Sequence, residues 1–419
     1  MRPLFLHRSH FAEVGELSLR LMELILGACR RRAGTAGELE EALRVPPGRV
    51  SLLQRSEPLH DGLLVAARPD IVYDSGVPKF VEFNIEGNVG GTLQADMLSR
   101  RFGDVYGPIE DGCGLAIPGS SVDARFSAIR SSLGLADGDL VAIPVFRQGA
   151  LPGAEEPEAF IDWLAPVCES GKRHGLDTVA CTMDQLKADD NAVLRLDGRR
   201  VDAVFRLFLS YDQPASPGLD ALTSAMQAGR VRMHTSETSW LLSDKTTLAW
   251  LWEDRPLLAG SDRELVERHV PWTALLPAGG RAREELMGYA VGHRAELVLK
   301  PAGGYGGQGV TLGPFASGER WAGALRAAGE AGEPYVLQRY VAADQVSIDF
   351  THEVTGAVER ASVPFVLGPF LFGRELSGAV VRHGEPGGGH VLNSHHGARV
   401  NSVVLVNQPP GARLGAEGS

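Results

Sequence analysis

Four polar residues lie close together in the sequence and have the types needed to act on a metal ion and a phosphate. Arg68 and Asp70 form an Arg-x-Asp motif, and Glu82 and Asn84 form a Glu-x-Asn motif that begins twelve residues after the aspartate. Two carboxylates and an amide oxygen are hard ligands of the kind that Mg²⁺ takes, and an arginine neutralises charge on a phosphoryl group. The motifs therefore predict a magnesium site at Asp70, Glu82 and Asn84, with Arg68 beside it. The alternative is a polar, solvent-facing hairpin with ordinary ion pairs.

A glycine-rich segment is a second candidate for phosphate binding. It reads Lys300-Pro-Ala-Gly-Gly-Tyr-Gly-Gly-Gln-Gly and follows an apolar run typical of a strand. Closely spaced glycines let backbone N–H groups approach an anion, so Gly304, Tyr305, Gly306 and Gly307 are expected to surround phosphate. The segment is neither a Walker loop, because no GK[ST] closes it, nor a dinucleotide fingerprint. A surface loop or hairpin turn is the alternative.

Lysine is rare in this chain, so its positions are informative. It occurs only at Lys79, Lys172, Lys187, Lys245 and Lys300, and arginine supplies the rest of the 41 basic residues. Where arginine is the usual basic residue, a lysine marks a place that suits a compact point charge, for instance against a nucleotide phosphate. Lys300 ends the strand before the glycines and is expected to reach the same phosphates. Lys245 lies in an amphipathic segment, where a solvated helix lysine is the alternative.

These residues need a scaffold, and the sequence predicts a mixed α/β one. Residues 63–86 are typical of a β-hairpin, in which side-chain alternation puts Arg68 with Asp70 on one face and Glu82 with Asn84 on one face. Residues 122–235 alternate between helix-like and strand-like runs, which favours a mostly parallel sheet. Helices are predicted over 11–33, 35–44, 93–102, 156–174, 218–228, 282–294 and 318–328, and strands over 139–146, 177–182, 201–208, 296–301 and 335–341.

Composition limits the class of protein. The chain has 419 residues, 44% of them hydrophobic, which is enough for a large core in two or three lobes. A net charge of −11 argues against a nucleic-acid surface. No long apolar run and no signal-peptide core are present, which predicts a cytoplasmic protein with no membrane partner. Cys29, Cys113, Cys168 and Cys181 are widely spaced and are expected to be free thiols. A homodimer is left open.

The order and spacing of these motifs over most of residues 63–407 resemble the circularly permuted ATP-grasp ligases, whose best-known member is glutathionylspermidine synthetase. The resemblance implies magnesium and phosphate binding by the two hairpin motifs and nucleotide binding by Lys245, Lys300 and the glycine-rich loop. It also implies that the strand Tyr335-Val-Leu-Gln-Arg-Tyr340, with Gln338 and Tyr340, holds the adenine. The expected cofactors are ATP and Mg²⁺.

The resemblance also implies a fold and an activity. The fold is expected to be an α/β (α+β) ATP-grasp fold, circularly permuted, with an α/β pre-ATP-grasp-like lobe and a helical N-terminal segment. The activity is expected to be amide formation between a small carboxylate and an amine through an acyl phosphate, with an amino acid or small peptide of specialised metabolism as substrate. The expected segments are 1–62 (helical support), 63–121 (metal-binding hairpin), 122–235 (substrate-side lobe), 236–407 (nucleotide-binding lobes with the lid) and 408–419 (tail).

The chain departs from the synthetase at two places. Tyr305 stands where the synthetase carries an arginine for the transferred phosphate, and Ile85-Glu-Gly-Asn-Val-Gly-Gly replaces the polar run that holds glutathione. Glutathione is therefore not the expected substrate. Two rival functions remain: loading of an amino acid onto a carrier-protein thiol, and non-catalytic nucleotide-dependent regulation.

Four further residues are candidates, and an alternative is weighed for each of the three arginines among them. Arg382 resembles a C-terminal arginine of the family that assists the phosphates, and a structural salt bridge is its alternative. Asn393 resembles a C-terminal motif of the permuted group and is expected to line the site. Arg147 and Arg206 are candidates for binding a substrate carboxylate bidentately, against a buried ion pair for each.

Overall fold

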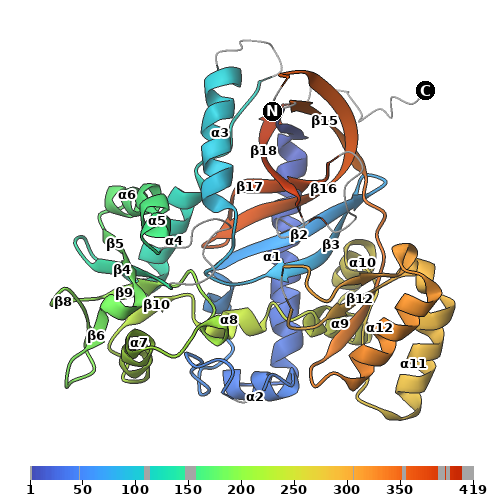
Figure 1. The fold of residues 1–419 in the computed structure, drawn as a ribbon, viewed down its shortest axis with the longest axis horizontal. Coiled ribbons are helices and arrows are strands. Elements are labelled where there is room, and N and C mark those ends of the chain that lie inside the picture. Colours follow the sequence, from blue (N-terminus) through green and yellow to red (C-terminus); the bar gives the residue numbers. More distant parts are fainter. Residues whose placement is uncertain are drawn as a thin grey trace.

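The structure is a computed structural model, which describes residues 2–46, 48–107, 114–146, 157–304, 306–351, 355–385, 392 and 397–407. Figure 1 shows a large central sheet with a smaller α/β lobe on either side. A mixed α/β architecture was expected from the sequence and is confirmed.

In the described residues the central sheet has seven strands and joins the two ends of the chain. Its order is β1-β18-β17-β16-β2-β3, with β15 paired to β16. The strands are β1 (Leu4–His7), β2 (Ala66–Asp74), β3 (Val77–Asn84), β15 (Gln345–Thr351), β16 (Val358–Phe372), β17 (Glu375–His383) and β18 (Arg399–Val406). Only β1 and β18 pair in parallel, and the other neighbours are antiparallel.

The long helix α1 (Arg8–Arg30) crosses the central sheet (Figure 1). Its apolar residues recur at helical spacing, and Val14, Leu21 and Ile25 have no exposed surface. They share one core with Leu367 and Val381 of the central sheet. The helix thus buries the face of the sheet that does not line the candidate site. Further support comes from α2 (Ala36–Ala42), which begins at the side-chain cap of Thr35.

The lobe drawn in green in Figure 1 contains a four-stranded parallel sheet of order β10-β9-β4-β5. Its strands are β4 (Leu140–Val145), β5 (Asp177–Thr182), β9 (Ala203–Phe205) and β10 (Arg232–His234), and β6 (Leu186–Ala188), β7 (Leu194–Leu196) and β8 (Arg199–Arg200) form a separate small sheet. The helices are α3 (Thr92–Tyr106), α4 (Ser121–Leu133), α5 (Pro157–Trp163), α6 (Ala165–Arg173) and α7 (Pro217–Gln227), of which α3 packs mainly on β17 and β18. The predicted parallel sheet is confirmed.

The lobe drawn in yellow and orange contains an antiparallel sheet of order β11-β14-β12-β13. The strands are β11 (Thr273–Leu275), β12 (Leu297–Pro301), β13 (Thr311–Leu312) and β14 (Tyr335–Arg339). Helices α11 (Gly280–Gly292) and α12 (Gly318–Glu330) pack on it around the fully buried Trp321. The preceding helices α8 (Glu237–Leu241), α9 (Thr246–Glu253) and α10 (Gly260–His269) connect this lobe to the central core.

Two predictions about helices were incomplete. The single helix expected over 156–174 is wrong, because the structure has α5 and α6 with a break at Leu164. Pro166 lies in the first turn of α6, where its missing N–H costs nothing, and proline there starts a new helix. Helices α4 and α10 were not predicted as separate elements.

Two smaller expectations concern cysteines and membranes. Cys29, Cys168 and Cys181 are free and buried, as expected, and Cys113 lies outside the described residues. Within the described ranges, no helix combines the length and apolar character that a membrane span requires. The boundaries of the five expected segments stay a prediction.

Candidate active site

The hairpin of β2 and β3 places the two sequence motifs opposite each other. Arg68 pairs with Asn84, and Asp70 pairs with Glu82, in the antiparallel register. The register shifts by one residue directly after Asp70, and such a bulge redirects side chains locally. Residues directly opposite each other lie on the same face of a hairpin, so Asp70 and Glu82 share one face.

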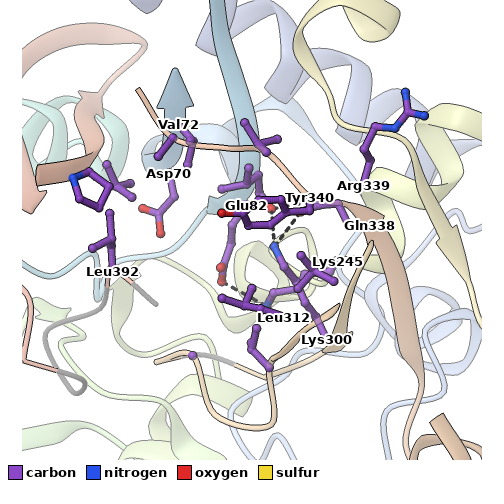
Figure 2. Close-up of a pocket in the computed structure, with 18 of the residues that line it drawn as sticks. Asp70, Val72, Glu82, Lys245, Lys300, Leu312, Gln338, Arg339, Tyr340 and Leu392 are labelled. Atoms are coloured by element: carbon purple, nitrogen blue, oxygen red, sulfur yellow. Dashed lines mark hydrogen bonds and ion pairs between the residues drawn. The ribbon is translucent and has the colours of Figure 1, made fainter. Parts of the chain in front are cut away.

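Asp70 and Glu82 line a cavity of about 370 Å³ between the central sheet and the antiparallel lobe. Figure 2 shows their carboxylates and the two lysines in this cavity. The predicted site residues that line the cavity are Asp70, Glu82, Lys245, Lys300, Gly304, Gly307, Gln338, Tyr340 and Arg382. Nine residues predicted from separate parts of the sequence thus line one space.

Asp70 is held by two arginines. Its Oδ1 lies 2.6 Å from Nη2 of Arg382 and 3.4 Å from Nε of Arg68. Burial alone would raise the pKa of the carboxyl group, but the charges of Arg382 and Arg68 hold that pKa below its usual value. Asp70 therefore stays ionised, and Arg382 makes a salt bridge while also lining the cavity.

Lys245 is not a solvated helix lysine. It lies between α8 and α9 and is only 5% exposed to solvent. Its Nζ is 3.1 Å from Oε1 of Glu82. Its Nζ also donates to the backbone oxygen of Gly304, and its backbone N–H donates to Ala302 O at 3.0 Å. These contacts tie the lysine to both the hairpin and the glycine-rich loop. Sequence periodicity did not reveal the break that releases Lys245 from the helix.

Lys300 extends from the end of β12 into the same cavity (Figure 2). Its Nζ donates to Oε1 of Gln338 at 2.7 Å, and Nε2 of Gln338 donates to Thr273 Oγ1 at 3.1 Å. Burial lowers the pKa of Lys300 to about 8, Lys245 adds to this effect, and the negative charges of Glu82 and Asp70 oppose it. Lys300 is a half-buried cation with no carboxylate in direct contact within the described residues.

The glycine-rich loop needs its glycines for backbone reasons. Gly306, Gly307 and Gly309 have φ values of +69°, +76° and +69°, in the left-handed region. A Cβ at Gly309 would come within 2.7 Å of Cγ of Pro301. A loop of this kind exposes successive N–H groups, which is how backbone binds phosphate.

The donor set of the cavity fits a magnesium ion together with phosphates. Among the described residues, the closest contacts of these ion pairs are made by Oδ1 of Asp70 and Oε1 of Glu82. The described residues contain no cluster of three or more His, Cys, Asp or Glu side chains suited to a metal ion. A metal here would thus take two carboxylates and complete its coordination from phosphates, as Mg²⁺ does at nucleotide sites.

The remaining predicted residues lie elsewhere. Arg68 is next to the cavity, with Nη1 on Gly90 O at 2.7 Å, and Asn84 uses its Nδ2 to donate to Arg68 O at 3.0 Å instead of lining the cavity. Arg206 is fully buried, donates to Thr235 O and Phe208 O, and lies 3.8 Å from Glu237. Arg206 thus takes part in a buried ion pair, which was the alternative to binding a substrate carboxylate. Arg147, Tyr305 and Asn393 lie outside the described residues, and Gly306 is in the loop but does not line the cavity.

The sequence reasoning missed the apolar wall of the cavity. It includes Val72, Val298, Leu312, Phe315 and Val366. Val72 is two residues after Asp70 and Val298 is two before Lys300, so strand alternation puts each on the same face as a predicted residue. That spacing was the available signal. An apolar wall beside a cluster of cations suits a ligand with a flat ring and an anionic tail.

Comparison with known proteins shows a shared fold. No protein family model and no curated protein matches this chain. A glutathione synthetase-like effector from Globodera pallida, solved in its apo form, matches 96% of this chain and 89% of its own, with a TM-score of 0.59 and 13% identity. The chain therefore has the expected ATP-grasp fold, and its circular permutation stays a prediction.

Two further solved structures match with lower scores. D-alanyl-alanine synthetase A from Vibrio cholerae O1 matches 65% of this chain and 89% of its own, with a TM-score of 0.33 and 11% identity. A D-cycloserine synthetase matches 64% of this chain and 92% of its own, with a TM-score of 0.29 and 15% identity. At these scores the likeness carries no argument about this chain.

Proposed function

We propose that this ATP-grasp chain is an ATP-dependent ligase that joins a small carboxylate to an amine and releases ADP and phosphate. One observation carries the proposal. Asp70 and Glu82 share a cavity with the cations of Lys245, Lys300 and Arg382. Phosphoryl transfer depends on this combination of metal-binding carboxylates and positioned cations more than on protein nucleophiles.

Different parts of the cavity suit the adenine and the phosphates of a nucleotide. The apolar wall and the strand that ends at Arg339 take the adenine, with Gln338 and Tyr340 beside it. Lys245, Lys300 and the loop amides face the phosphates. Asp70 and Glu82 would hold Mg²⁺, which would supply Lewis-acid stabilisation of phosphate charge. In the free protein Arg382 pairs with Asp70 and Lys245 pairs with Glu82. When nucleotide is bound, these two cations contact phosphate instead, and the two carboxylates contact the metal.

The reaction has two steps that balance without a protein nucleophile. A carboxylate oxygen of the acid attacks the γ-phosphorus, the bond to the β-phosphate oxygen breaks, and ADP leaves. The amine nitrogen then attacks the acyl carbon, phosphate leaves, and the amine loses a proton. Cationic side chains stabilise the charge that moves in the first step. The glycine-rich loop covers the acyl phosphate, because water would hydrolyse it.

A screen of acid and amine pairs tests the proposal. We expect ADP and phosphate in equal amounts with a matching pair, and a hydroxamate when hydroxylamine replaces the amine. Glu82→Ala and Asp70→Asn should lose this activity. If amino acids, peptides and simple acids all fail to release ADP while ATP binds, the chain is a nucleotide-binding regulator. If only a carrier-protein thiol accepts the acyl group, the chain is a carrier-loading enzyme.

The pKa of Lys300 predicts a pH dependence of nucleotide binding. Nucleotide phosphates favour the charged ammonium, so the bound state holds a proton that the free protein loses as the pH rises through about 8. We expect the Kd for ATP to be constant well below pH 8 and to rise up to about tenfold per pH unit above it. Lys300→Arg should remove this rise, because arginine stays charged. Titration calorimetry from pH 6 to 9.5 gives the measurement, and an equally steep rise in the arginine variant would contradict the assignment.

A further inference from the structure

A second pocket, of about 200 Å³, lies at the N-terminus of α3 and is separate from the nucleotide cavity in its lining. Gly90, Gly91 and Thr92 form one side of it, and Arg125 of α4 forms another. Gly91 is the N-cap of α3, has φ +90° and provides no side-chain cap, and the first turn contains no acidic residue. The first N–H groups of this fifteen-residue helix therefore border a pocket, and such a helix end attracts anions.

Arg125 is a buried cation without an anionic partner in the described part of the chain. It is 4% exposed, and it lies over the rings of Phe205 and Phe372, with its Cζ 5.3 and 4.5 Å from their centroids. Its Nη2 donates to Val89 O at 3.0 Å, but its buried Nε has no hydrogen-bond partner. Burial lowers the pKa of the guanidinium below its usual value, and the Asp96 carboxylate offsets only part of this. A buried arginine of this kind is stabilised by an anion that binds from outside.

The same pocket contains an unused acceptor and an apolar end. Oε1 of Gln94 is buried without a hydrogen-bond partner. Leu93, Val122 and Trp163 are among the apolar side chains that complete the lining. The pocket thus presents donors for a carboxylate, an acceptor for an ammonium group and an apolar space, within a volume below that of pockets for drug-sized ligands.

Arg68 connects this pocket to the nucleotide cavity. Its Nη1 donates to the oxygen of Gly90, which lines the second pocket, and its Nε is 3.4 Å from Asp70, which lines the first. Only the side chain of Arg68 therefore lies between Gly90, in the second pocket, and Asp70, where the nucleotide phosphates are proposed to bind.

We infer that this pocket binds an α-amino acid with an apolar side chain, whose carboxylate contacts Arg125 and the first N–H groups of α3 and whose ammonium group contacts Gln94. The inference rests on the proposed function, since it names one of the two molecules that the ligase joins. The pocket is built from Arg125 and the start of α3, and it uses none of the residues assigned to magnesium or the nucleotide.

Titration calorimetry of the full chain without nucleotide tests the inference. Leucine, valine and phenylalanine are the probes, with aspartate, the primary amide of leucine and N-acetyl-leucine as comparisons. We expect one of the apolar amino acids to bind and the three comparison compounds to bind at least about tenfold more weakly, because each alters one recognised group. Arg125→Gln should weaken binding about ten- to a hundredfold. The matched control is Arg281→Gln, whose side chain is 90% exposed on α11, and it should bind like the wild type.

A second variant keeps the test decisive if Arg125→Gln does not fold. Trp163→Ala enlarges the apolar end and should shift the preference toward larger side chains while the requirement for a free carboxylate remains. The inference is overturned if no apolar amino acid binds, or if both pocket variants bind like the wild type. The proposed function fails separately, when no acid and amine pair releases ADP from ATP. If an amino acid binds through Arg125 but no ADP is released, the inference about the pocket holds and the proposed ligase activity is wrong.

Discussion

Glu82→Gln should lower ATP turnover about 100- to 1000-fold and leave the protein folded. The variant keeps the size of the side chain and one accepting oxygen but removes the negative charge that the proposed metal site requires. Glu82 is 23% exposed in its side chain, and Lys245, which contacts it at 3.1 Å, also donates to Gly304 O, so the buried ammonium group keeps a hydrogen-bond partner in the variant. ADP release measured with the matching substrates gives the turnover.

Nucleotide binding should separate the two roles of the Glu82 position. Without magnesium, ATP should bind Glu82→Gln at least as tightly as the wild type, because Lys245 no longer has a carboxylate partner. With magnesium, the wild type should gain affinity and the variant should not. Glu285→Gln is the matched control, since Glu285 pairs with Arg281 on the exposed face of α11. Equal turnover in Glu82→Gln and Glu285→Gln would show that Glu82 is not a metal ligand.

Arg382→Met should lower the free energy of unfolding by about 3–5 kcal/mol at pH 7. Asp70 and Arg382 are both buried, and within the described residues the carboxylate would keep only Arg68 as an ion-pair partner. The pKa of Asp70 is lowered in the folded protein, so its contribution is present above the unfolded pKa and is lost as the pH falls through the folded value. The difference between variant and wild type should therefore shrink below about pH 4. Urea unfolding at several pH values gives the measurement.

The control for Arg382→Met is a surface pair of the same two residue types. Arg360 contacts Asp349 through Nε at 2.6 Å and Nη2 at 3.2 Å, and its side chain is 63% exposed. Arg360→Met should cost less than about 1 kcal/mol. A similar cost for both variants would mean that burial does not strengthen the dependence of Asp70 on Arg382. Arg382→Met should also lose ligase turnover, because Arg382 lines the cavity.

The sequence identified the polar side of the candidate site because that side uses rare residues at fixed spacings. The Arg-x-Asp and Glu-x-Asn motifs are short and lie on two adjacent strands, whose antiparallel register places Asp70 opposite Glu82. Lys245 and Lys300 were visible because lysine is scarce in this chain. The positions of these four side chains relative to one another follow from tertiary contacts between the central sheet and the antiparallel lobe, which no local pattern contains.

Other features had no local signal. Arg125 is one arginine among many, and its burial between Phe205 and Phe372 depends on residues far apart in the chain. Arg206 has the same residue type and is also buried, but it lies near Glu237 and donates to two carbonyl oxygens, while its Nη2 has no hydrogen-bond partner. The break at Lys245 arises because its backbone bonds to Ala302, which helical periodicity of the segment cannot reveal.

The pairing of β1 with β18 has a topological consequence. Leu4 lies beside Val403 and His7 beside Val406, so the two ends of the chain run next to each other in one sheet. Because the strands are parallel, a linker from Val406 to Leu4 must span about 11 Å, which about four extended residues can do. A circularly permuted gene that encodes such a linker is therefore expected to retain this sheet.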